Sequence, residues 1–324
     1  MMRKERIRGF TAAIWQWYSV HKRALPWRDL LISDDTERAY RILVSEVMLQ
    51  QTQVDRVREI YVRFLREFPT LRVLAAAGNR QVILAWRGMG YNSRVLRLRD
   101  ATRRIMDEWN GVFPQEMRAL QSIKGLGHYT AAAIRNFAFN LPTPCIDTNI
   151  RRILHRTFVG PECPDGTWKK DDRYLIEIAE EVLHAALDGQ VGHDARNWHA
   201  ALMDFGSLVQ TKKDPKWEEC PLTRKGLMKA TEKNVPQIEI RTSKPEPGRV
   251  IKGSFVPDRI VRGRVIEALR DAPAGLSLDT LGRRVAADWS LVAHRTWLTA
   301  ILTKLRKEEL VEERSGKYAL RVEA

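Results

Sequence analysis

One acidic residue stands inside an apolar helical segment. Glu46 falls in residues 44–52, within a stretch whose apolar residues recur at helical spacing over about 37–50. Its neighbours at i−4, i−3 and i+3 are Ile42, Leu43 and Leu49, which places Glu46 on the core side of the helix. A buried carboxylate is either satisfied by an arginine or backbone amides, or acts as a general acid whose pKa is raised by loss of water.

A second acid marks the start of another expected helix. Asp147 lies in residues 145–152, directly before Thr148 and Asn149. Aspartate is common at helix N-caps because its side chain accepts a backbone N–H, so taken alone Asp147 is more typical of a cap than of a catalyst. Its chemistry depends on what lies nearby.

Two glycines flank one apolar residue immediately before a helix of small and apolar residues. Gly125 and Gly127 surround Leu126, and Lys124 and Tyr129 lie beside them. Glycine permits a tight turn with positive φ, and the amides that open the next helix can face a phosphate. The pattern indicates a hairpin that holds a DNA backbone, although an ordinary connection between helices would look similar.

The elements that must position these residues are almost entirely helical between residues 1 and 230. Proline and glycine separate segments of helical periodicity, which lie at about 7–21, 37–50, 53–67, 79–87, 92–109, 116–122, 128–140, 147–157, 171–187 and 195–209.

The C-terminal part of the chain has a different organisation. Between 232 and 257 the periodicity fails and prolines and glycines accumulate, which indicates a linker. Three helices and a short hairpin around Ser315-Gly316 follow, a pattern typical of a winged helix. We therefore expect a helical region at 1–231, a linker at 232–257 and a small α+β domain at 258–324.

Composition narrows the class of partner. The chain has 324 residues, a formal net charge of +15 and a 44% hydrophobic share, so it folds and most readily binds a polyanion such as nucleic acid. Its three cysteines, Cys145, Cys163 and Cys220, are too few and too dispersed for a disulfide framework. No stretch approaches the ~20 apolar residues of a membrane span. We expect a cytoplasmic, nucleoid-associated monomer that does not bind membranes.

Several motifs, in this order, resemble the helix-hairpin-helix DNA glycosylases, and among them the adenine glycosylases of the MutY type. The resemblance covers about residues 8–230, and the joint occurrence of its motifs makes it specific. The matching strings are Leu25-Pro26-Trp27-Arg28, residues 45–54, Gly88-Met89-Gly90-Tyr91, Gly125-Leu126-Gly127 with Tyr129-Thr130, Asp147-Thr148-Asn149 and residues 202–206. It implies an all-α fold of two helical subdomains, here followed by the winged-helix-like domain.

The resemblance also implies catalytic roles. Glu46 resembles the acid that protonates the departing adenine, and Asp147 the carboxylate that stabilises the sugar cation or adds to it. Two acids suit this bond, because one must neutralise the leaving base while another faces a positive sugar. Tyr129 stands where strand-cleaving relatives carry a lysine that forms a Schiff base. A phenol cannot form that imine, so we expect base removal without efficient strand scission.

Other positions are implied to contact the substrate. Arg28 and Leu49 correspond to the base pocket, although an arginine in a loop is also a common phosphate contact. The base must be flipped out of the duplex, and the residues that resemble those contacting DNA are Gln51, Thr52, Tyr91, Lys124, Gly125, Gly127 and Asn149.

Three features depart from the family pattern. Of the four cysteines that usually hold a four-iron, four-sulfur cluster, only Cys220 is present, with Gln210, Trp217 and Gly226 at the other places; we expect no cofactor. Ala200 stands where a glutamine or glutamate often reaches the adenine. The winged-helix-like domain replaces a Nudix-like domain that recognises 8-oxoguanine, and it is either a second DNA-contacting module or a packing domain.

The sequence therefore predicts a monofunctional DNA glycosylase of base excision repair, acting on double-stranded DNA with a mismatch or oxidised base. It would remove adenine mispaired with 8-oxoguanine or guanine. One alternative is a glycosylase for thymine or uracil opposite guanine, which Ala200 favours, while residues 50–52 and Tyr91 favour adenine. Another is a non-catalytic protein that binds DNA structures, against which Glu46 and Asp147 argue.

Overall fold

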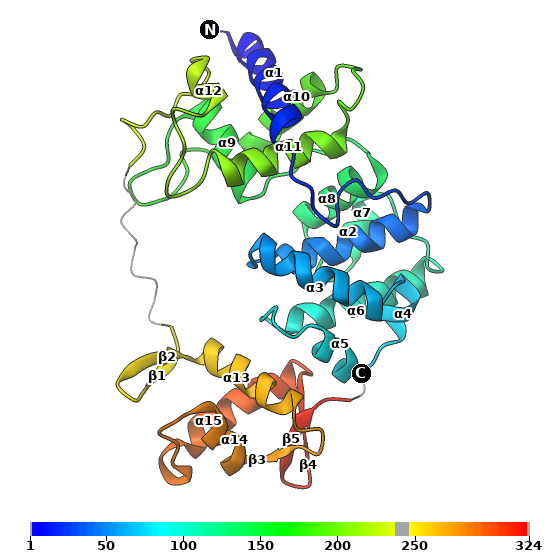
Figure 1. The fold of residues 1–324 in the computed structure, drawn as a ribbon, viewed down its shortest axis with the longest axis vertical. Coiled ribbons are helices and arrows are strands. Elements are labelled where there is room, and N and C mark those ends of the chain that lie inside the picture. Colours follow the sequence, from blue (N-terminus) through cyan, green and yellow to red (C-terminus); the bar gives the residue numbers. More distant parts are fainter. Residues whose placement is uncertain (1, 237–245, 323–324) are drawn as a thin grey trace. The chain divides into compact units, whose positions relative to one another are not determined.

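The computed structural model describes residues 2–236 and 246–322. These residues fold as two compact units that do not follow the order of the chain. The first unit comprises the described residues of 1–43 and 114–241, and the second those of 44–113 and 242–324. Figure 1 labels the elements of both.

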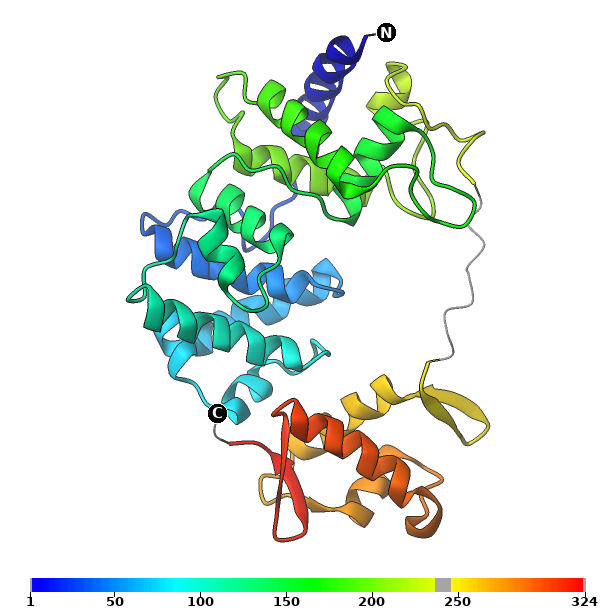
Figure 2. The same cartoon turned by 180° about the vertical axis from the view of Figure 1, so that it is seen from behind.

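The first unit is helical and is closed by its N-terminal helix. In Figures 1 and 2, α1 (blue) lies against the green helices α10 and α11. Phe10 of α1 contacts Phe158 and Trp198 edge to face, and Trp15 donates from Nε1 to the carbonyl of Ala186 at 3.0 Å. The helices of this unit are α1 (Arg3–His21), α7 (Met117–Ser122), α8 (His128–Phe139), α9 (Thr148–Leu154), the π-helix η1 (His155–Val159), α10 (Asp172–Ala186), α11 (Ala195–Leu208) and α12 (Pro221–Arg224).

One helix, α2 (Asp35–Leu49), runs from the first unit into the second, because the division follows Leu43. The second unit continues with α3 (Val54–Glu67), α4 (Leu71–Ala76), α5 (Asn79–Ala85) and α6 (Ser93–Glu108). Pairs of these helices pack together, α4 on α6 and α3 on α5. The helical prediction for residues 1–230 is confirmed, and none of the described residues there forms a strand. No helix of residues 2–236 and 246–322 is long and apolar enough to cross a bilayer.

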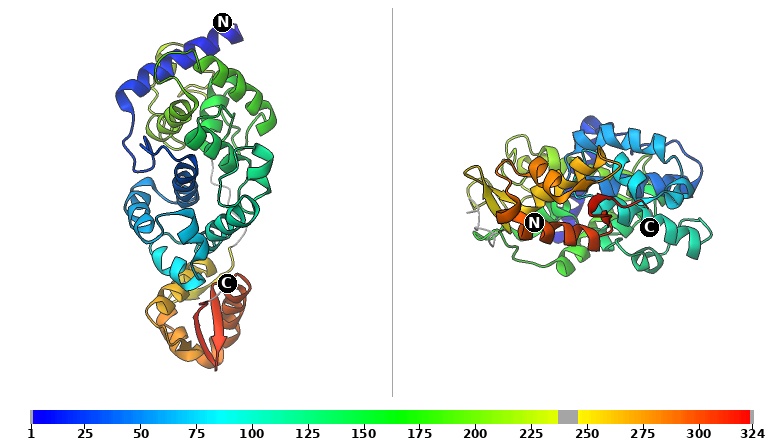
Figure 3. Two further views of the ribbon diagram at one scale, coloured as in Figure 1. Left: turned by 90° about the vertical axis from the view of Figure 1, so that its right-hand side faces the viewer. Right: turned by 90° about the horizontal axis from the view of Figure 1, so that it is seen from below.

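The C-terminal residues of the second unit form the expected small α+β domain. Three helices pack around a three-stranded antiparallel sheet of order β3-β5-β4, in which Val311 pairs with Leu320 and Leu276 with Tyr318. Figure 3 shows the red hairpin of β4 and β5 beside α15. Their bounds are α13 (Asp258–Arg270), β3 (Leu276–Ser277), α14 (Leu278–Val285), α15 (Leu291–Lys307), β4 (Val311–Arg314) and β5 (Lys317–Leu320).

Part of the expected linker at 232–257 has regular structure. Residues 237–245 lie outside the described residues, but β1 (Gly248–Ile251) and β2 (Ser254–Pro257) pair as an antiparallel hairpin. The two residues between these strands, Lys252 and Gly253, both have positive φ, at 46° and 80°. Positive φ at both turn positions matches the twist of a two-residue hairpin. Gly253 therefore forms part of a tight hairpin turn, whereas the sequence predicted that it belongs to an irregular linker.

Candidate functional site

Glu46 lies on the last full turn of α2, as the sequence predicts. Glu46 is only 7% exposed, and the neighbouring residues Ser45, Val47 and Met48 are also buried. The core-side position expected from the apolar neighbours is therefore confirmed. Leu49 ends the same helix and is partly exposed.

A buried arginine that the sequence analysis missed fixes the end of this helix. The Arg94 guanidinium donates six hydrogen bonds, to the carbonyls of Val47, Met48, Gln50, Met89 and Gly90 and to the hydroxyl of Thr52. The last carbonyls of a helix lack intrahelical partners and carry partial negative charge, which suits a cation there. Burial lowers the pKa of Arg94 to about 10. The sequence does carry one indication that Arg94 is buried. At helical spacing, Arg94 falls on the same face as the apolar residues Leu98 and Ile105.

Two residues held by this arrangement adopt a backbone conformation that is rare outside glycine. Gln51 has φ of 55° and Tyr91 has φ of 43°. Both side chains are exposed, Tyr91 by 52%, and the Tyr91 ring centroid lies 5.5 Å from the Arg94 guanidinium carbon. Left-handed backbone at non-glycine residues costs about 1–3 kcal/mol each and persists where the surroundings impose it. The Arg94 contacts impose it here, so two polar side chains are presented outward.

The predicted hairpin connects α7 to α8 in the first unit. Gly125 has φ of 99°, as expected for the tight turn, whereas Gly127 is the N-cap of α8 with φ of −76°. A Cβ at Gly127 would meet no atom within 4 Å, so the N-terminus of α8 is open to a ligand. Lys124 beside it is exposed. Amides at a helix start with a neighbouring lysine favour a phosphate.

Asp147 is the N-cap of α9 and has an unusual environment. One oxygen, Oδ1, accepts from the Ile150 N–H at 2.6 Å, and Oδ2 accepts from the Asn149 amide at 3.2 Å. The capping interpretation is therefore correct for one oxygen. Burial nevertheless raises the pKa of Asp147 above its ordinary value, and these hydrogen bonds oppose that rise.

The amide that contacts Asp147 belongs to a longer chain of polar contacts. Arg152 donates to Asn149 Oδ1 at 2.6 Å and to the carbonyl of Gly206 at 2.8 Å. Burial lowers the pKa of Arg152 to about 10. Because Asn149 is held by Arg152, its amide group is oriented with the N–H side toward the Asp147 carboxyl.

Helix α11 passes both Tyr129 and Asn149. The Tyr129 hydroxyl lies 4.0 Å from the Met203 sulfur, and a Cβ at Gly206 would come within 2.6 Å of the Asn149 Cβ. Only glycine therefore allows α11 to approach α9 this closely. The first unit holds Tyr129, Asp147 and Asn149, and the second holds Glu46, Leu49, Gln51, Thr52 and Tyr91.

Comparisons with known proteins agree with this geometry. Residues 44–171 match the HhH-GPD superfamily of base excision DNA repair proteins. The adenine DNA glycosylase of Mycolicibacterium smegmatis is 31% identical over 305 residues, covering 94% of this chain and 93% of that protein. This chain belongs to the family of adenine DNA glycosylases. The mouse adenine DNA glycosylase is 35% identical over 219 residues, which cover 67% of this chain and 41% of the mouse protein, so the chain spans less than half the length of that relative.

Solved structures share the fold. A thermostable thymine-DNA glycosylase superposes with a TM-score of 0.59 and 24% identity, covering 69% of this chain and 96% of that one. Endonuclease III in a non-covalent DNA complex superposes with a TM-score of 0.54 and 19% sequence identity, covering 70% of this chain and 96% of that one. The predicted helix-hairpin-helix fold is confirmed, and this chain is a glycosylase-family protein of base excision repair.

In this member of the glycosylase family, Arg28 lines a small pocket of the first unit. Its guanidinium donates to both oxygens of Asp204, at 2.7 and 2.9 Å, and Asp204 is fully buried and also pairs with Arg23. Asp204 lies in the matching string at residues 202–206, where no role was predicted for it. The pocket residues are Tyr18, Trp27, Arg28, Asp29, Leu30, Arg38, Ile42, Phe137, Arg196, Asn197 and Ala200. Ala200, the position that departs from the family pattern, is thus part of this pocket.

The loop that would carry the family's iron–sulfur cluster has other occupants at the ligand places. Cys220 is fully buried with its sulfur 3.7 Å from that of Met228. Gln210 accepts from Arg156 at 3.2 Å through Oε1, and the Trp217 ring lies 5.6 Å from the same guanidinium. No group of three or more potential metal ligands converges within the described parts of the chain. One thiol, an amide and an indole do not fit a cluster that needs four ligands.

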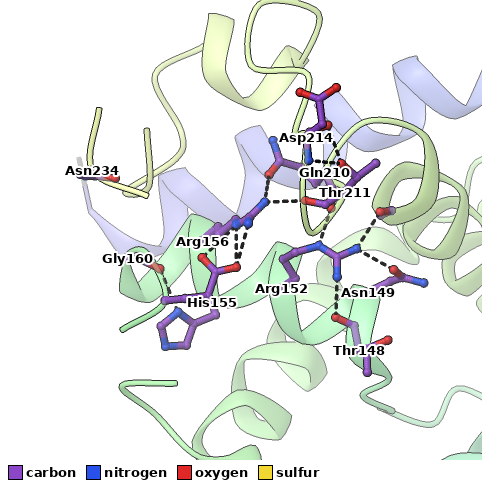
Figure 4. A network of polar contacts seen from close by, with 12 residues as sticks. Thr148, Asn149, Arg152, His155, Arg156, Gly160, Gln210, Thr211, Asp214 and Asn234 are labelled. Atoms are coloured by element: carbon purple, nitrogen blue, oxygen red, sulfur yellow. Dashed lines mark hydrogen bonds and ion pairs between the residues drawn. The ribbon is translucent and has the colours of Figure 1, made fainter. Parts of the chain in front are cut away.

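Arginines instead tie this loop to the helices before it, as Figure 4 shows. Arg156 forms a buried ion pair with Glu162 at 2.7 Å and donates to the Thr211 carbonyl at 3.0 Å. Its own carbonyl accepts from the backbone N–H groups of Lys229 and Ala230. Arg152 donates to the carbonyl of Gln210. The same network thus reaches from the loop to Asn149, next to Asp147.

Proposed function

We propose that this protein is a monofunctional DNA glycosylase that hydrolyses the N-glycosidic bond of adenine mispaired with 8-oxoguanine or guanine. One observation carries the proposal: the Asp147 carboxyl is held by Ile150 and Asn149. Residue 129 of the hairpin helix is a tyrosine instead of a lysine. The 31% identity to a mycobacterial adenine DNA glycosylase over 94% of the chain supports it.

The two carboxyl groups take different roles in this proposal. Glu46 gives its proton to a ring nitrogen of the departing adenine as the bond to the sugar C1′ breaks. The ionised Asp147 faces the positive sugar that remains, and water then adds to C1′ and releases a proton. The hydrogen bonds from Ile150 and Asn149 orient the carboxylate while it stabilises that charge.

A carboxamide in the pocket supports adenine as the base. Asn197 precedes Ala200 by three residues on α11, so both face the same pocket. An asparagine amide can donate to N7 and accept from the N6 amino group of adenine at once. Asn197 would thus supply the polar contact that Ala200 lacks. Its Oδ1 lies 3.4 Å from Lys22 Nζ, a weak contact that a base can displace.

One experiment tests the reaction and its main alternative. Single-turnover base release is measured on duplexes with A opposite 8-oxoguanine, A opposite G, T opposite G and U opposite G, using Glu46→Gln and Asn197→Ala as variants. We expect adenine release that Glu46→Gln abolishes and Asn197→Ala slows at least tenfold. Release of thymine or uracil alone would assign the protein to the mismatch class, which Ala200 favours. Tight binding without release would contradict catalysis.

We also propose that the protein functions without an iron–sulfur cluster, with the Arg156 contacts holding the loop. The donor set around Cys220 supports this, because its Sγ lies against Met228 in a fully buried position. Purified protein should lack the broad absorbance near ~400 nm that thiolate-bound iron gives. Iron and sulfide in stoichiometric amounts would contradict the proposal.

A further inference from the structure

Tyr18 carries a buried hydroxyl that has no hydrogen-bond partner among the described residues. The residue lies on α1, in the first unit, and is 5% exposed. Its Oη is shielded from solvent and forms no hydrogen bond with those residues. Buried polar groups in folded proteins are nearly always paired, because an unpaired hydroxyl loses its contacts with water and gains nothing in return. The position of this hydroxyl therefore points to a ligand.

The hydroxyl belongs to the pocket around Arg28, which Tyr18 lines. Two charged groups of that pocket already have partners. The Arg28 guanidinium donates to both oxygens of Asp204 at 2.7 and 2.9 Å, and the Asp29 carboxylate accepts from Lys22 at 2.6 Å. Tyr18 differs from them, because its polar atom is still available to a ligand that enters the pocket.

A second pocket residue has the same property. Arg196, on α11, has a buried Nε without a hydrogen-bond partner among the described residues. The Nε of a guanidinium can only donate, whereas a phenol hydroxyl can donate and accept. Burial raises the pKa of Tyr18, so its hydroxyl keeps the proton that it can donate. These atoms favour a ligand that presents hydrogen-bond acceptors, such as the ring nitrogens of a nucleobase.

The other walls suit a flat ring, although the pocket must widen to admit one. Trp27 and Phe137 supply aromatic side chains, and bases stack on such rings. The pocket has a volume of about 20 Å³, which is enough for one water molecule. Asp29 is the part of the wall best able to move, because it is exposed, has φ of 50° and is held by an exposed ion pair with Lys22. Exposed ion pairs are weak, so a base can displace this side chain.

We propose that Tyr18 is a specificity-determining residue, whose hydroxyl donates a hydrogen bond to an acceptor atom of the flipped adenine once Asp29 has moved aside. The inference rests on the proposed function, because the base is the one excised there. It adds a contact from α1 to the contact from Asn197 on α11, and these two helices pack together. A site with a buried hydroxyl discriminates against a base that leaves the hydroxyl unpaired.

Tyr18→Phe removes the hydroxyl and keeps the ring. Because the hydroxyl has no partner in the free protein, we expect the midpoint of urea unfolding to stay unchanged or to rise. Tyr174→Phe is the matched control, since Tyr174 lies on α10 in the same unit and does not line the pocket.

The assay is equilibrium binding of full-length protein, by fluorescence anisotropy, to two duplexes with 8-oxoguanine in the opposite strand. One carries 2′-fluoro-2′-deoxyadenosine, whose fluorine destabilises a positive sugar and so prevents base release; the other carries a stable abasic analogue in its place. Tyr18→Phe should weaken binding to the first duplex about fivefold, as expected for one lost hydrogen bond, and to the second by less than about twofold. Tyr174→Phe should bind both as wild type does.

Three results would overturn this inference. Unchanged binding of Tyr18→Phe to the adenine duplex would show that the hydroxyl does not contact the base. Equal weakening on both duplexes would show that it acts on the DNA without the base. A lower midpoint of unfolding would show that the hydroxyl has a partner within the protein.

These outcomes are distinct from failure of the proposed function, because base release from the four mismatched duplexes is a separate measurement. A protein that binds adenine through Tyr18 and releases no base would retain the contact and lose the proposed reaction. A protein that releases adenine while Tyr18→Phe binds as wild type would retain the reaction and lose the contact.

Discussion

Replacing Arg94 tests whether one buried guanidinium organises both the loop that carries Gln51 and the loop that carries Tyr91. Arg94→Met keeps the length and apolar stem of the side chain but removes all six hydrogen bonds to residues 47–52 and 89–90. A buried carbonyl left without a partner costs about 1–3 kcal/mol. Water reaches the acceptors near exposed Gln51, so we expect the full cost at only one or two carbonyls. The free energy of unfolding should therefore fall by about 2–4 kcal/mol.

The effect on catalysis should exceed what lost stability explains. Without the Arg94 guanidinium, the Gln50 carbonyl loses that donor and the Gly90 carbonyl keeps Trp86 Nε1, so Gln51 and Tyr91 are held less firmly in left-handed backbone. A displacement of about 1 Å in such groups lowers rates by about 100-fold. Single-turnover base release and mismatch affinity are measured well below the unfolding transition, which is followed by urea denaturation. Arg94→Lys keeps the charge but cannot reach both loops, so it should recover part of the stability and little of the rate.

The matched control is Arg97→Met, on the same helix but exposed, where the guanidinium donates a hydrogen bond to Ser93 Oγ. It should change the free energy of unfolding by less than about 0.5 kcal/mol and leave base release unchanged. The contrary result is that Arg94→Met matches Arg97→Met both in its free energy of unfolding and in its rate of base release. In that case the two loops would not depend on the Arg94 guanidinium, and the explanation of their backbone conformation would be wrong.

Four other predictions concern the first unit. Because burial raises the pKa of Asp147 in the folded state, protonation stabilises the fold at low pH, and that contribution is lost as pH rises through the raised pKa. Asp147→Asn, which keeps a helix cap, should raise the free energy of unfolding at pH 7 by about 1 kcal/mol while abolishing base release; lower stability with wild-type release would refute both roles. In the pH profile of base release, the acid limb should have an apparent pKa above the ordinary aspartate value. Asn149→Ala removes a hydrogen bond that lowers the Asp147 pKa, so it should raise that apparent pKa further. An unchanged apparent pKa would assign the acid limb to another group. Glu162→Gln leaves the Arg156 charge buried without its partner and should cost about 3–5 kcal/mol, measured by denaturation; a loss under about 1 kcal/mol would show that the pair does not hold the loop. Borohydride should trap no covalent DNA adduct, because Tyr129 has no amine; an adduct would point to another nucleophile.

Local chemistry was readable directly from the sequence. Helical periodicity placed the helices, because burial of one face repeats every 3.6 residues. Glu46 was predicted on a core face from its i−4, i−3 and i+3 neighbours, and Asp147 at a helix start from its residue type and position. The C-terminal hairpin was predicted at residues 310–322 from Ser315 and Gly316, both of which have positive φ. In each case the determining interaction lies within a few residues of the position concerned.

Contacts between distant segments were decided only by tertiary structure. Arg94 joins a helix end at 47–50 to a loop at 89–90, and Arg156 joins Glu162 to the loop at 210–211. No local pattern identifies which carbonyls a long side chain will reach. The sequence alone also treated residues 258–324 as a separate domain, whereas the fold groups them with residues 44–113 through Arg270. That grouping follows from buried hydrogen bonds across almost 190 residues of chain, a separation over which sequence periodicity carries no information.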